Sequence, residues 1–153
     1  AYCQDNAIGW TDWSGLDDPF LNFCKGAIAF RKAHPALRQE RFLTGDAMED
    51  GTIEIAWYRP DGAFMDDGAW KDGNFRALGL FLCKPGNDEG PDQLFLVCNA
   101  GGDCQVTLPQ VNGIRAWKRV LDTGAEDDAF AVHPAENSAM VYGASVAVFE
   151  PVA

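Results

Sequence analysis

Basic residues are scarce in this sequence, and their scarcity argues against one class of partner. Twelve Lys and Arg stand against 23 Asp and Glu, which gives a formal net charge of −11. Nucleic acids and anionic membrane surfaces are bound through clusters of Lys and Arg that neutralise phosphates. We therefore expect no nucleic acid and no membrane as a partner, and we interpret the acidic surplus as a solvated surface.

The sequence also lacks a long apolar run, a metal-binding motif and paired cysteines. No stretch approaches the roughly 20 apolar residues of a membrane-spanning helix. The five cysteines form an odd set without a CxxC pair, and the closely spaced Cys/His clusters that hold metals are missing. Thiols within apolar runs are typical of a reducing compartment. We predict no cofactor, no metal and a cytoplasmic location.

An initiator methionine is missing as well, because the chain begins Ala1-Tyr2-Cys3. We expect the chain to be processed, or excised from a longer polypeptide. With 153 residues, of which 47% are hydrophobic, it is long enough for one ordinary domain with its own core.

One strong helix is predicted over residues 19–33. Asp18 is a favourable N-cap, and Pro19 suits the first helical position, where its missing N–H is no loss. Apolar residues then recur at helical spacing and form a stripe of Phe20, Phe23, Cys24, Ala27 and Ile28. The helix is expected to end at His34-Pro35.

Six segments after the helix are short, rich in β-branched and aromatic residues, and separated by Gly, Pro, Asn and Asp. They are TIEIAWY (52–58), ALGLFLC (77–83), QLFLVCN (93–99), CQVTLP (104–109), RAWKRVLD (115–122) and SVAVFE (145–150). Short strands without intervening helices predict an antiparallel β-sandwich. The glycine-containing loop 98–104 is predicted to be a hairpin connection.

No catalytic residue is predicted from composition and spacing. The paired acids are interpreted as a helix entry at 17–18 and as solvated loops at 66–67 and 127–128. His34 and His133 each precede a proline and are interpreted as backbone punctuation. Gly101 and Gly102 lie between strands rather than before a helix, so they lack the dipole of a phosphate site.

Tryptophans are the remaining candidates for binding, because sugar rings stack on exposed aromatic faces. Trp57 and Trp70 bracket the loop RPDGAFMDDGA, where they could pack structurally or form a carbohydrate platform. Trp117 is expected to share a strand face with Leu121 and to lie in or near the core.

The order of several segments resembles the C-terminal part of bacterial glycogen debranching enzymes, the isoamylase-type members of the α-amylase superfamily. The segments are AYCQDNAIGWTDW, RKAHPALRQERFLTG, WYRPDGAFMDDGAW, ALGLFLC and LFLVCNA. The resemblance implies a parent enzyme that hydrolyses α-1,6 branch linkages in glycogen or its limit dextrins. It also implies that the catalytic carboxylates lie on a (β/α)8 barrel that precedes this region, so none maps onto this chain.

The resemblance further implies a division of the chain. Residues 1–44 would be the last loop and helix of the barrel, and residues 45–153 a mainly β domain, the C-terminal antiparallel β-sandwich. Gln4, Asp5 and Asn6 match the family's Gln-Asp-Asn triplet and would lie at the rim of the substrate cleft, touching sugar or bracing the loop. Ala7 and Gly9 depart from the family's pattern at this point, which favours bracing.

Our hypothesis from the sequence is that the segment alone is inactive and serves a structural role in a debranching enzyme. Its expected partners are the missing barrel and, through the parent enzyme, glycogen or a limit dextrin, with self-association through the exposed helix as a further expectation. The alternative is a non-catalytic glycogen-binding module that uses Trp57, Trp70 or Trp117.

Overall fold

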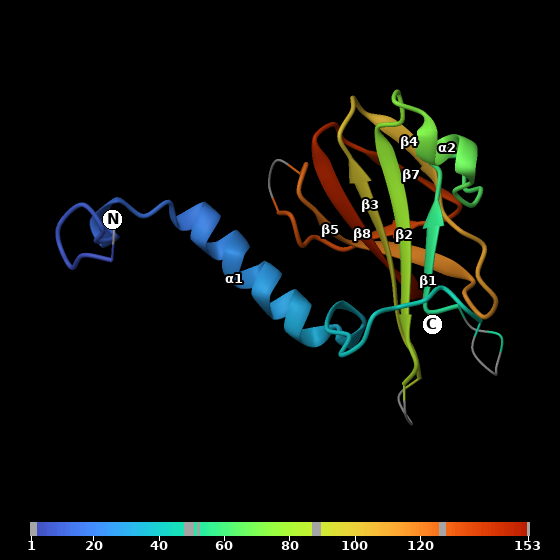
Figure 1. Ribbon diagram of the computed structural model, residues 1–153, viewed down its shortest axis with the longest axis horizontal. Helices are drawn as coiled ribbons and strands as arrows, with labels where there is room; N and C mark the ends of the chain where they lie inside the picture. Colours follow the sequence, from blue (N-terminus) through green and yellow to red (C-terminus); the bar gives the residue numbers. More distant parts are fainter. Residues whose placement is uncertain (1–2, 48–50, 52, 87–89, 126–127, 153) are drawn as a thin grey trace.

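The computed structural model describes residues 3–47, 51, 53–86, 90–125 and 128–152. An N-terminal arm of loop and helix precedes a set of strands (Figure 1). The elements, in chain order, are η1 (Trp13–Gly15), α1 (Asp18–Ala33), η2 (Pro35–Leu37), β1 (Ile55–Tyr58), α2 (Asp67–Lys71), β2 (Ala77–Lys84), β3 (Asp92–Asn99), β4 (Cys104–Thr107), β5 (Ala116–Asp122), β6 (His133–Ala135), β7 (Ser138–Val141) and β8 (Ser145–Val152).

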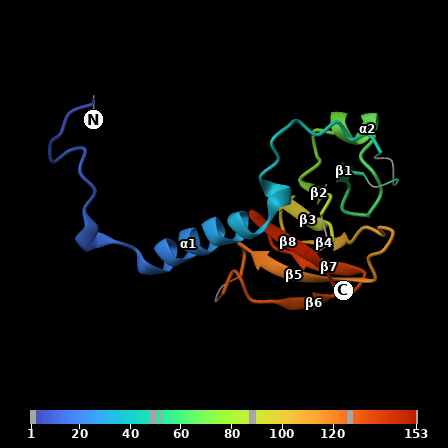
Figure 2. The same cartoon turned by 90° about the horizontal axis from the view of Figure 1, so that it is seen from below.

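The strands form two antiparallel sheets, so the predicted mainly β fold is confirmed. A six-stranded sheet has the order β1-β2-β3-β8-β5-β6, and β4 pairs with β7 in a two-stranded ribbon. The ribbon lies over one face of the larger sheet, which we call the inner face, whereas α1 approaches the other side, the outer face (Figure 2).

The main core lies between the two sheets. Alternate residues of the large sheet point inward, among them Phe81, Phe95 and Phe149, and they meet Val106 and Val141 of the ribbon. Phe95 and Phe149 are both fully buried. The other buried members of this core include Ala56, Tyr58, Cys83, Val97, Leu108, Trp117, Ala135 and Ala147.

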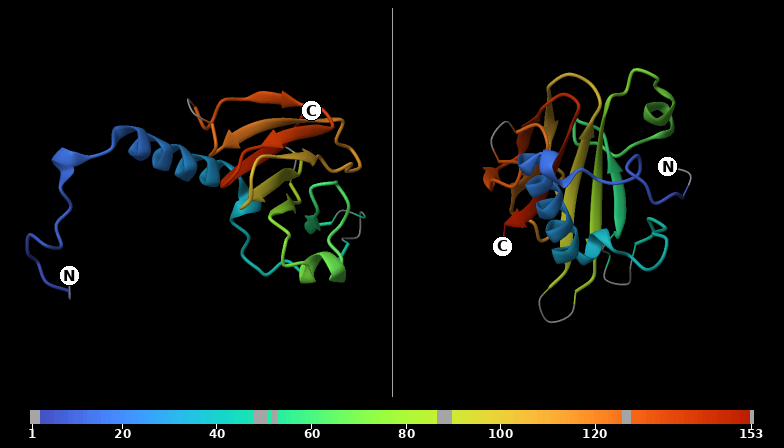
Figure 3. Two further views of the ribbon diagram at one scale, coloured as in Figure 1. Left: turned by 90° about the horizontal axis from the view of Figure 1, so that it is seen from above. Right: turned by 90° about the vertical axis from the view of Figure 1, so that its left-hand side faces the viewer.

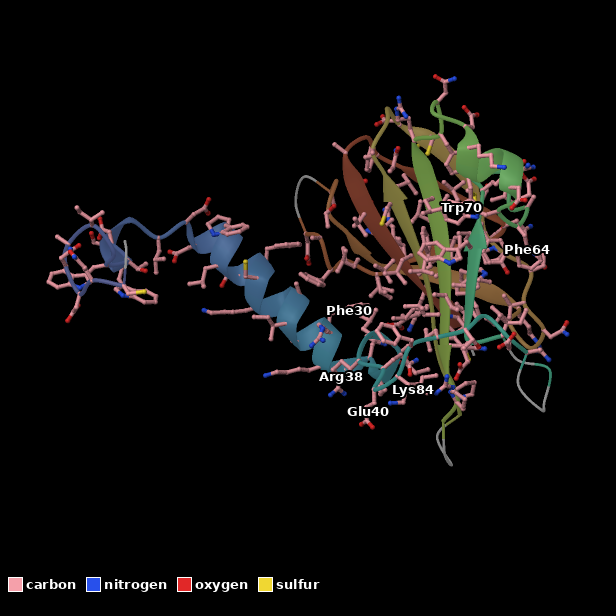
Figure 4. All side chains as sticks on the ribbon, viewed as in Figure 1. Phe30, Arg38, Glu40, Phe64, Trp70 and Lys84 are labelled. Atoms are coloured by element: carbon pink, nitrogen blue, oxygen red, sulfur yellow. The ribbon has the colours of Figure 1, made fainter. Side chains whose placement is uncertain are left out.

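A second apolar cluster lies on the outer face. Its buried strand residues are Leu82, Leu94, Val120, Leu121 and Val148, and the turn after α1 adds Ala36. Phe30 of α1 packs against this cluster, and Figure 4 shows its side chain directed from the end of the helix toward the sheet. The remainder of α1 extends away from the sheets (Figure 3).

Helix α1 begins one residue earlier than predicted. Asp17, and not Asp18, is the N-cap: its Oδ1 accepts a hydrogen bond from the Phe20 backbone N–H at 3.0 Å. Gly26 lies in the helix interior, where glycine is unfavourable. A Cβ at this position would lie 2.5 Å from the Phe130 ring, so the absent side chain lets the loop after β5 contact the helix.

The expected connection between the third and fourth predicted strands is wrong. Residues 98–104 are not a hairpin, because β3 and β4 belong to different sheets. Asn99 stabilises the connection from β3 in one sheet to β4 in the other. Its Nδ2 donates to the carbonyl oxygens of Gly102, Val141 and Tyr142, and its Oδ1 accepts from the Gly101 N–H. A side chain that satisfies four backbone groups replaces the ladder that a hairpin would supply.

Trp117 is buried as predicted, but it does not share a face with Leu121. The pairing of β5 with β8 shifts register between Arg119 and Leu121, which leaves Val120 as an extra residue. This bulge turns Leu121 to the outer face, whereas Trp117 stays in the inner core.

The sequence analysis did not predict the turns η1 and η2, the short helix α2 or the short strands β6 and β7. Asp66 and Asp67 do not lie in a simple solvated loop, because Asp66 caps the short helix α2 and accepts from the Ala69 N–H at 2.8 Å. Strands β6 and β7 are three and four residues long. Strand β6 contains the His133-Pro134 pair and β7 has only a weak apolar pattern, so neither resembles a strand in the sequence.

Candidate functional site

The triplet Gln4-Asp5-Asn6 lies in the exposed loop at the far end of the arm (Figure 1). Its hydrogen bonds are local. The indole Nε1 of Trp10 donates to Asp5 Oδ1 at 2.6 Å, the Asn6 carboxamide donates to Gln4 Oε1 at 3.2 Å, and the Ile8 N–H donates to Asn6 Oδ1. The triplet thus ties its own loop together, at a distance from the β-sheets.

Trp57 and Trp70 form an exposed aromatic corner beside the outer face. Their ring centroids lie 5.8 Å apart with the planes at 74°, and they are 37% and 53% exposed. Trp57 stands on β1 opposite Leu80, which in turn faces Leu96 on β3. Figure 4 shows Trp70 beside β1 under α2. By contrast, Trp117 is only 3% exposed, so it cannot stack on a sugar in this fold.

Arg59 fixes the loop between β1 and α2. Its guanidinium hydrogen-bonds Asp61 at 2.6 Å and lies 3.5 Å from Asp66. The hydrogen bond from Arg59 holds the pKa of Asp61 below its usual value, and the same bond raises the pKa of Arg59. The acids of this loop therefore act as structural anions.

In each of the other two pairs of acids, one member accepts a hydrogen bond from a backbone N–H. Asp17 caps α1, and Asp128 Oδ1 accepts from the Phe130 N–H at 2.8 Å, whereas Asp127 lies outside the described residues. Within the described part of the chain, no group of three or more His, Cys, Asp or Glu could hold a metal ion. Among the same residues, no helix is both long and apolar enough to cross a membrane.

His34 joins the end of α1 to the sandwich, a role that the sequence did not reveal. Its Nδ1 lies 3.0 Å from Asp92 Oδ1, and its Nε2 lies 3.2 Å from Glu150 Oε1. The Ala36 N–H donates to Asp92 Oδ2 at 2.7 Å, and Lys118 Nζ pairs with Glu150. The interpretation of His34 as backbone punctuation was therefore incomplete. Its partners Asp92 and Glu150 lie 58 or more positions further along the sequence, so no local pattern predicts these contacts.

A cavity of about 250 Å³ opens on the inner face of the large sheet at the β1 edge, next to the segment 110–112. Aromatic rings and carboxamides line it, namely Tyr58, Phe64, Phe81, Gln93, Gln110 and Asn112. Phe64 is 59% exposed and lies on the side of β1 away from α1 (Figure 4). No sequence pattern indicates this cavity, because its lining comes from segments that only the fold brings together.

Comparison with known proteins adds an independent finding. The family model described as "Isoamylase, C-terminal" matches residues 54–149. The "Glycogen operon protein GlgX homolog" of Mycobacterium bovis is 32% identical over 135 residues, which cover 80% of this chain and 19% of the relative. An isoamylase of Pseudomonas amyloderamosa is 29% identical, covering 94% of this chain and 18% of the relative.

A third relative points in the same direction. The "Glycogen debranching enzyme" of Yersinia pseudotuberculosis is 26% identical over 129 residues, which cover 84% of this chain and 17% of the relative. The chain thus spans about a fifth of the length of the curated relatives that it matches.

Proposed function

The chain belongs to the isoamylase C-terminal domain family, and from this premise we propose that it is the C-terminal part of a glycogen debranching enzyme. The parent polypeptide hydrolyses α-1,6-glucosidic branch linkages in glycogen or limit dextrins. Residues 1–44 close its catalytic barrel, and residues 45–153 form the C-terminal sandwich. The segment lacks the catalytic carboxylates, is inactive alone, and serves a structural role in the cytoplasm, where exposed thiols such as Cys98 stay reduced.

The observation that carries this proposal is the exposed part of the apolar stripe of α1, because Phe23 of the stripe packs against Phe130 whereas Phe20 and Ile28 do not become buried. The helix contacts the sandwich through Phe23, Gly26 and Phe30. At about 100° per residue, the centre of the predicted stripe lies roughly 90° around the helix axis from that contact. Phe20 and Ile28 therefore remain 63% and 57% exposed. Exposed apolar stripes of this kind mark a protein–protein contact.

The outer face of the large sheet supports the same conclusion. Beyond the part that α1 and η2 cover, it presents half-buried leucines at positions 78, 80 and 96, next to the Trp57–Trp70 corner. The arm adds Ile8, Trp10 and Trp13, which are 88%, 64% and 74% exposed. We propose that the preceding barrel covers the stripe of α1, and that the isolated chain uses this surface to self-associate.

Activity is tested with the longer polypeptide. We expect the coding sequence upstream of Ala1 to encode a barrel with three catalytic carboxylates, and the longer product to release linear oligosaccharides from a glycogen limit dextrin. The 153-residue chain alone should release none. Hydrolysis by this chain alone would contradict the proposal, as would an upstream sequence without such a barrel.

The structural role is tested on α1 with a matched pair of substitutions. Ile28→Asp places a charge in the apolar stripe, whereas Ala29→Asp places the same charge on the exposed opposite side. In the longer polypeptide, Ile28→Asp should lower the melting temperature by several degrees more than Ala29→Asp does, because it buries an unpaired charge. In the 153-residue chain both should have small effects. Equal effects in the longer polypeptide would remove α1 from the interface.

The Trp57–Trp70 corner favours a second function, a non-catalytic glycogen-binding module. Two exposed rings at a steep angle offer stacking faces to neighbouring sugars. Affinity electrophoresis in glycogen-containing gels distinguishes the two functions. Retardation that Trp57→Ala and Trp70→Ala abolish would favour the binding module, and unretarded migration of the wild-type chain would dismiss it.

A further inference from the structure

We propose that the cavity at the β1 edge binds one neutral monosaccharide unit, and that this unit is a glucosyl residue of an α-glucan. The choice of glucose rests on the proposed function, whereas the class of ligand rests on the cavity itself. This cavity opens on the inner face and is distinct from the Trp57–Trp70 corner, which stands on the outer face.

The size and charge of the cavity select the ligand class. Cavities that enclose drug-sized ligands measure about 300–1,000 Å³, so a volume of about 250 Å³ suits one small ring. The described residues that line the cavity are all uncharged, in a chain whose formal net charge is −11. Phosphates, carboxylates and cations therefore find no counter-charge among these lining residues.

Aromatic rings supply a stacking wall. Tyr58 is 6% exposed and packs edge-on against Phe95, with centroids 5.7 Å apart and planes at 88°. The ring of Phe64 packs against that of Tyr58, with the ring centroids 4.8 Å apart, and the rest of the Phe64 ring is open to the cavity mouth. The negative face of such a ring attracts the C–H edge of a sugar.

Carboxamides supply the polar contacts. Gln93 is half-buried on β3, whereas Gln110 and Asn112 are exposed at the mouth. Each carboxamide carries two donor hydrogens and an acceptor oxygen, which is the mixed set that sugar hydroxyls require. The phenol of Tyr58, which also lines the cavity, is a further polar group that is protonated at neutral pH, because an ordinary tyrosine pKa is about 10 and burial raises the pKa of Tyr58 further.

The walls are held in place before any ligand arrives. The Arg59–Asp61 ion pair and the hydrogen bond from the Thr107 N–H to the Pro60 carbonyl, 2.7 Å, fix the turn that carries Phe64. On the other side, the Trp117 indole donates to the Pro109 carbonyl at 3.1 Å and anchors the segment with Gln110. A preorganised site loses less entropy on binding.

The proposal is tested by NMR titration of the 153-residue chain with maltose and with glucose. Saturable shifts of the Tyr58, Gln93 and Asn112 amides are expected. Phe64→Ala should weaken maltose binding about three- to tenfold, which is the scale of one aromatic stacking contact. Phe20→Ala removes a comparably exposed phenylalanine from α1 and is the matched control, with unchanged affinity expected.

A second variant guards against local unfolding in the first. Gln110→Ala with Asn112→Ala changes only exposed side chains and should also weaken binding. The proposal would be overturned if maltose left the NMR signals of the Tyr58, Gln93 and Asn112 amides unshifted. It would also be overturned if maltose binding survived Phe64→Ala but was lost in Trp70→Ala. Tighter binding of glucose 1-phosphate than of glucose would overturn the neutral ligand class. Because hydrolysis is measured on the longer polypeptide, failure of this site leaves the debranching proposal standing, and the reverse also holds.

Discussion

The inner face of the six-stranded sheet is covered by the β4–β7 ribbon, whereas the outer face is covered in part by the end of α1, the segment that follows it as far as Leu43, and Phe130. Most of the inner side chains are buried, among them Phe95, Phe149 and Val97. The outer face and the arm keep several large apolar side chains in contact with water. The inner face thus supplies much of the stability of the sandwich, and the exposed apolar side chains of the outer face and the arm are the ones that the proposed contact with a barrel would cover.

The largest difference in stability is expected between the alanine variants of two phenylalanines, one on the inner face and one on the arm. Phe95→Ala removes a fully buried ring that contacts Tyr58, Trp117 and Phe149, so the free energy of unfolding should fall by about 3–5 kcal/mol. Phe20→Ala, on the exposed arm, should lower it by less than about 0.5 kcal/mol. Urea denaturation measures both. Similar losses at the two sites would end the distinction between the regions.

Two glycines test how tightly the inner face is packed. A Cβ at Gly79 would lie 2.7 Å from Phe95 Cζ and 3.1 Å from Tyr58 Cβ. Gly79→Ala should therefore destabilise the fold by about 1–3 kcal/mol. A Cβ at Gly73 would meet none of the described residues within 4 Å, so Gly73→Ala should be neutral or slightly stabilising. A neutral Gly79→Ala would indicate a looser inner face.

The attachment of the arm can be weakened selectively at His34. His34→Ala removes two contacts to carboxylates and should cost about 1–3 kcal/mol at pH 6. Hydrogen exchange should accelerate in α1 and remain slow in β2 and β3. Arg38→Ala, which removes one exposed contact to the Lys32 carbonyl, is the control. Uniform acceleration would mean that arm and sandwich unfold together.

The smallest effect concerns alkaline pH. Burial raises the pKa of Tyr58 above its value in the unfolded chain, which is about 10. The resulting stabilisation is present below about pH 10 and is lost as the pH rises through the folded pKa. Tyr58→Phe should flatten this decline while changing stability at pH 7 by less than about 1 kcal/mol. Parallel declines in urea midpoint would exclude Tyr58 as their source.

The strands with continuous apolar runs could be predicted from the sequence, because residues such as Phe95 and Val97 have few alternatives to burial. Family membership could be predicted too, from the order of motifs. The pairing of strands could not, since it depends on long-range contacts such as the bonds of Asn99 to Val141 and Tyr142. A single extra residue at Val120 was enough to place Leu121 on the opposite face.

The candidate site was less predictable than the fold. Trp57 and Trp70 attracted attention as residue types, and the fold brings their rings together. The cavity residues did not, because Phe64, Gln93 and Gln110 are unremarkable in sequence and meet only through the packing of three separate segments. Local patterns carry information on local structure, and a pocket is a non-local object.

Strand β8 lies in the middle of the large sheet, between β3 and β5, although it follows all the other strands in the chain. During synthesis on the ribosome, the backbone groups of β3 and β5 that will pair with β8 therefore stay unpaired until β8 has been made. In that interval they can pair with other chains. The sandwich can form only after residues 145–152 have left the exit tunnel. A premature stop codon shortly before Ser145 would consequently not yield a smaller native domain. It would yield an unfolded chain that chaperones bind and proteases degrade.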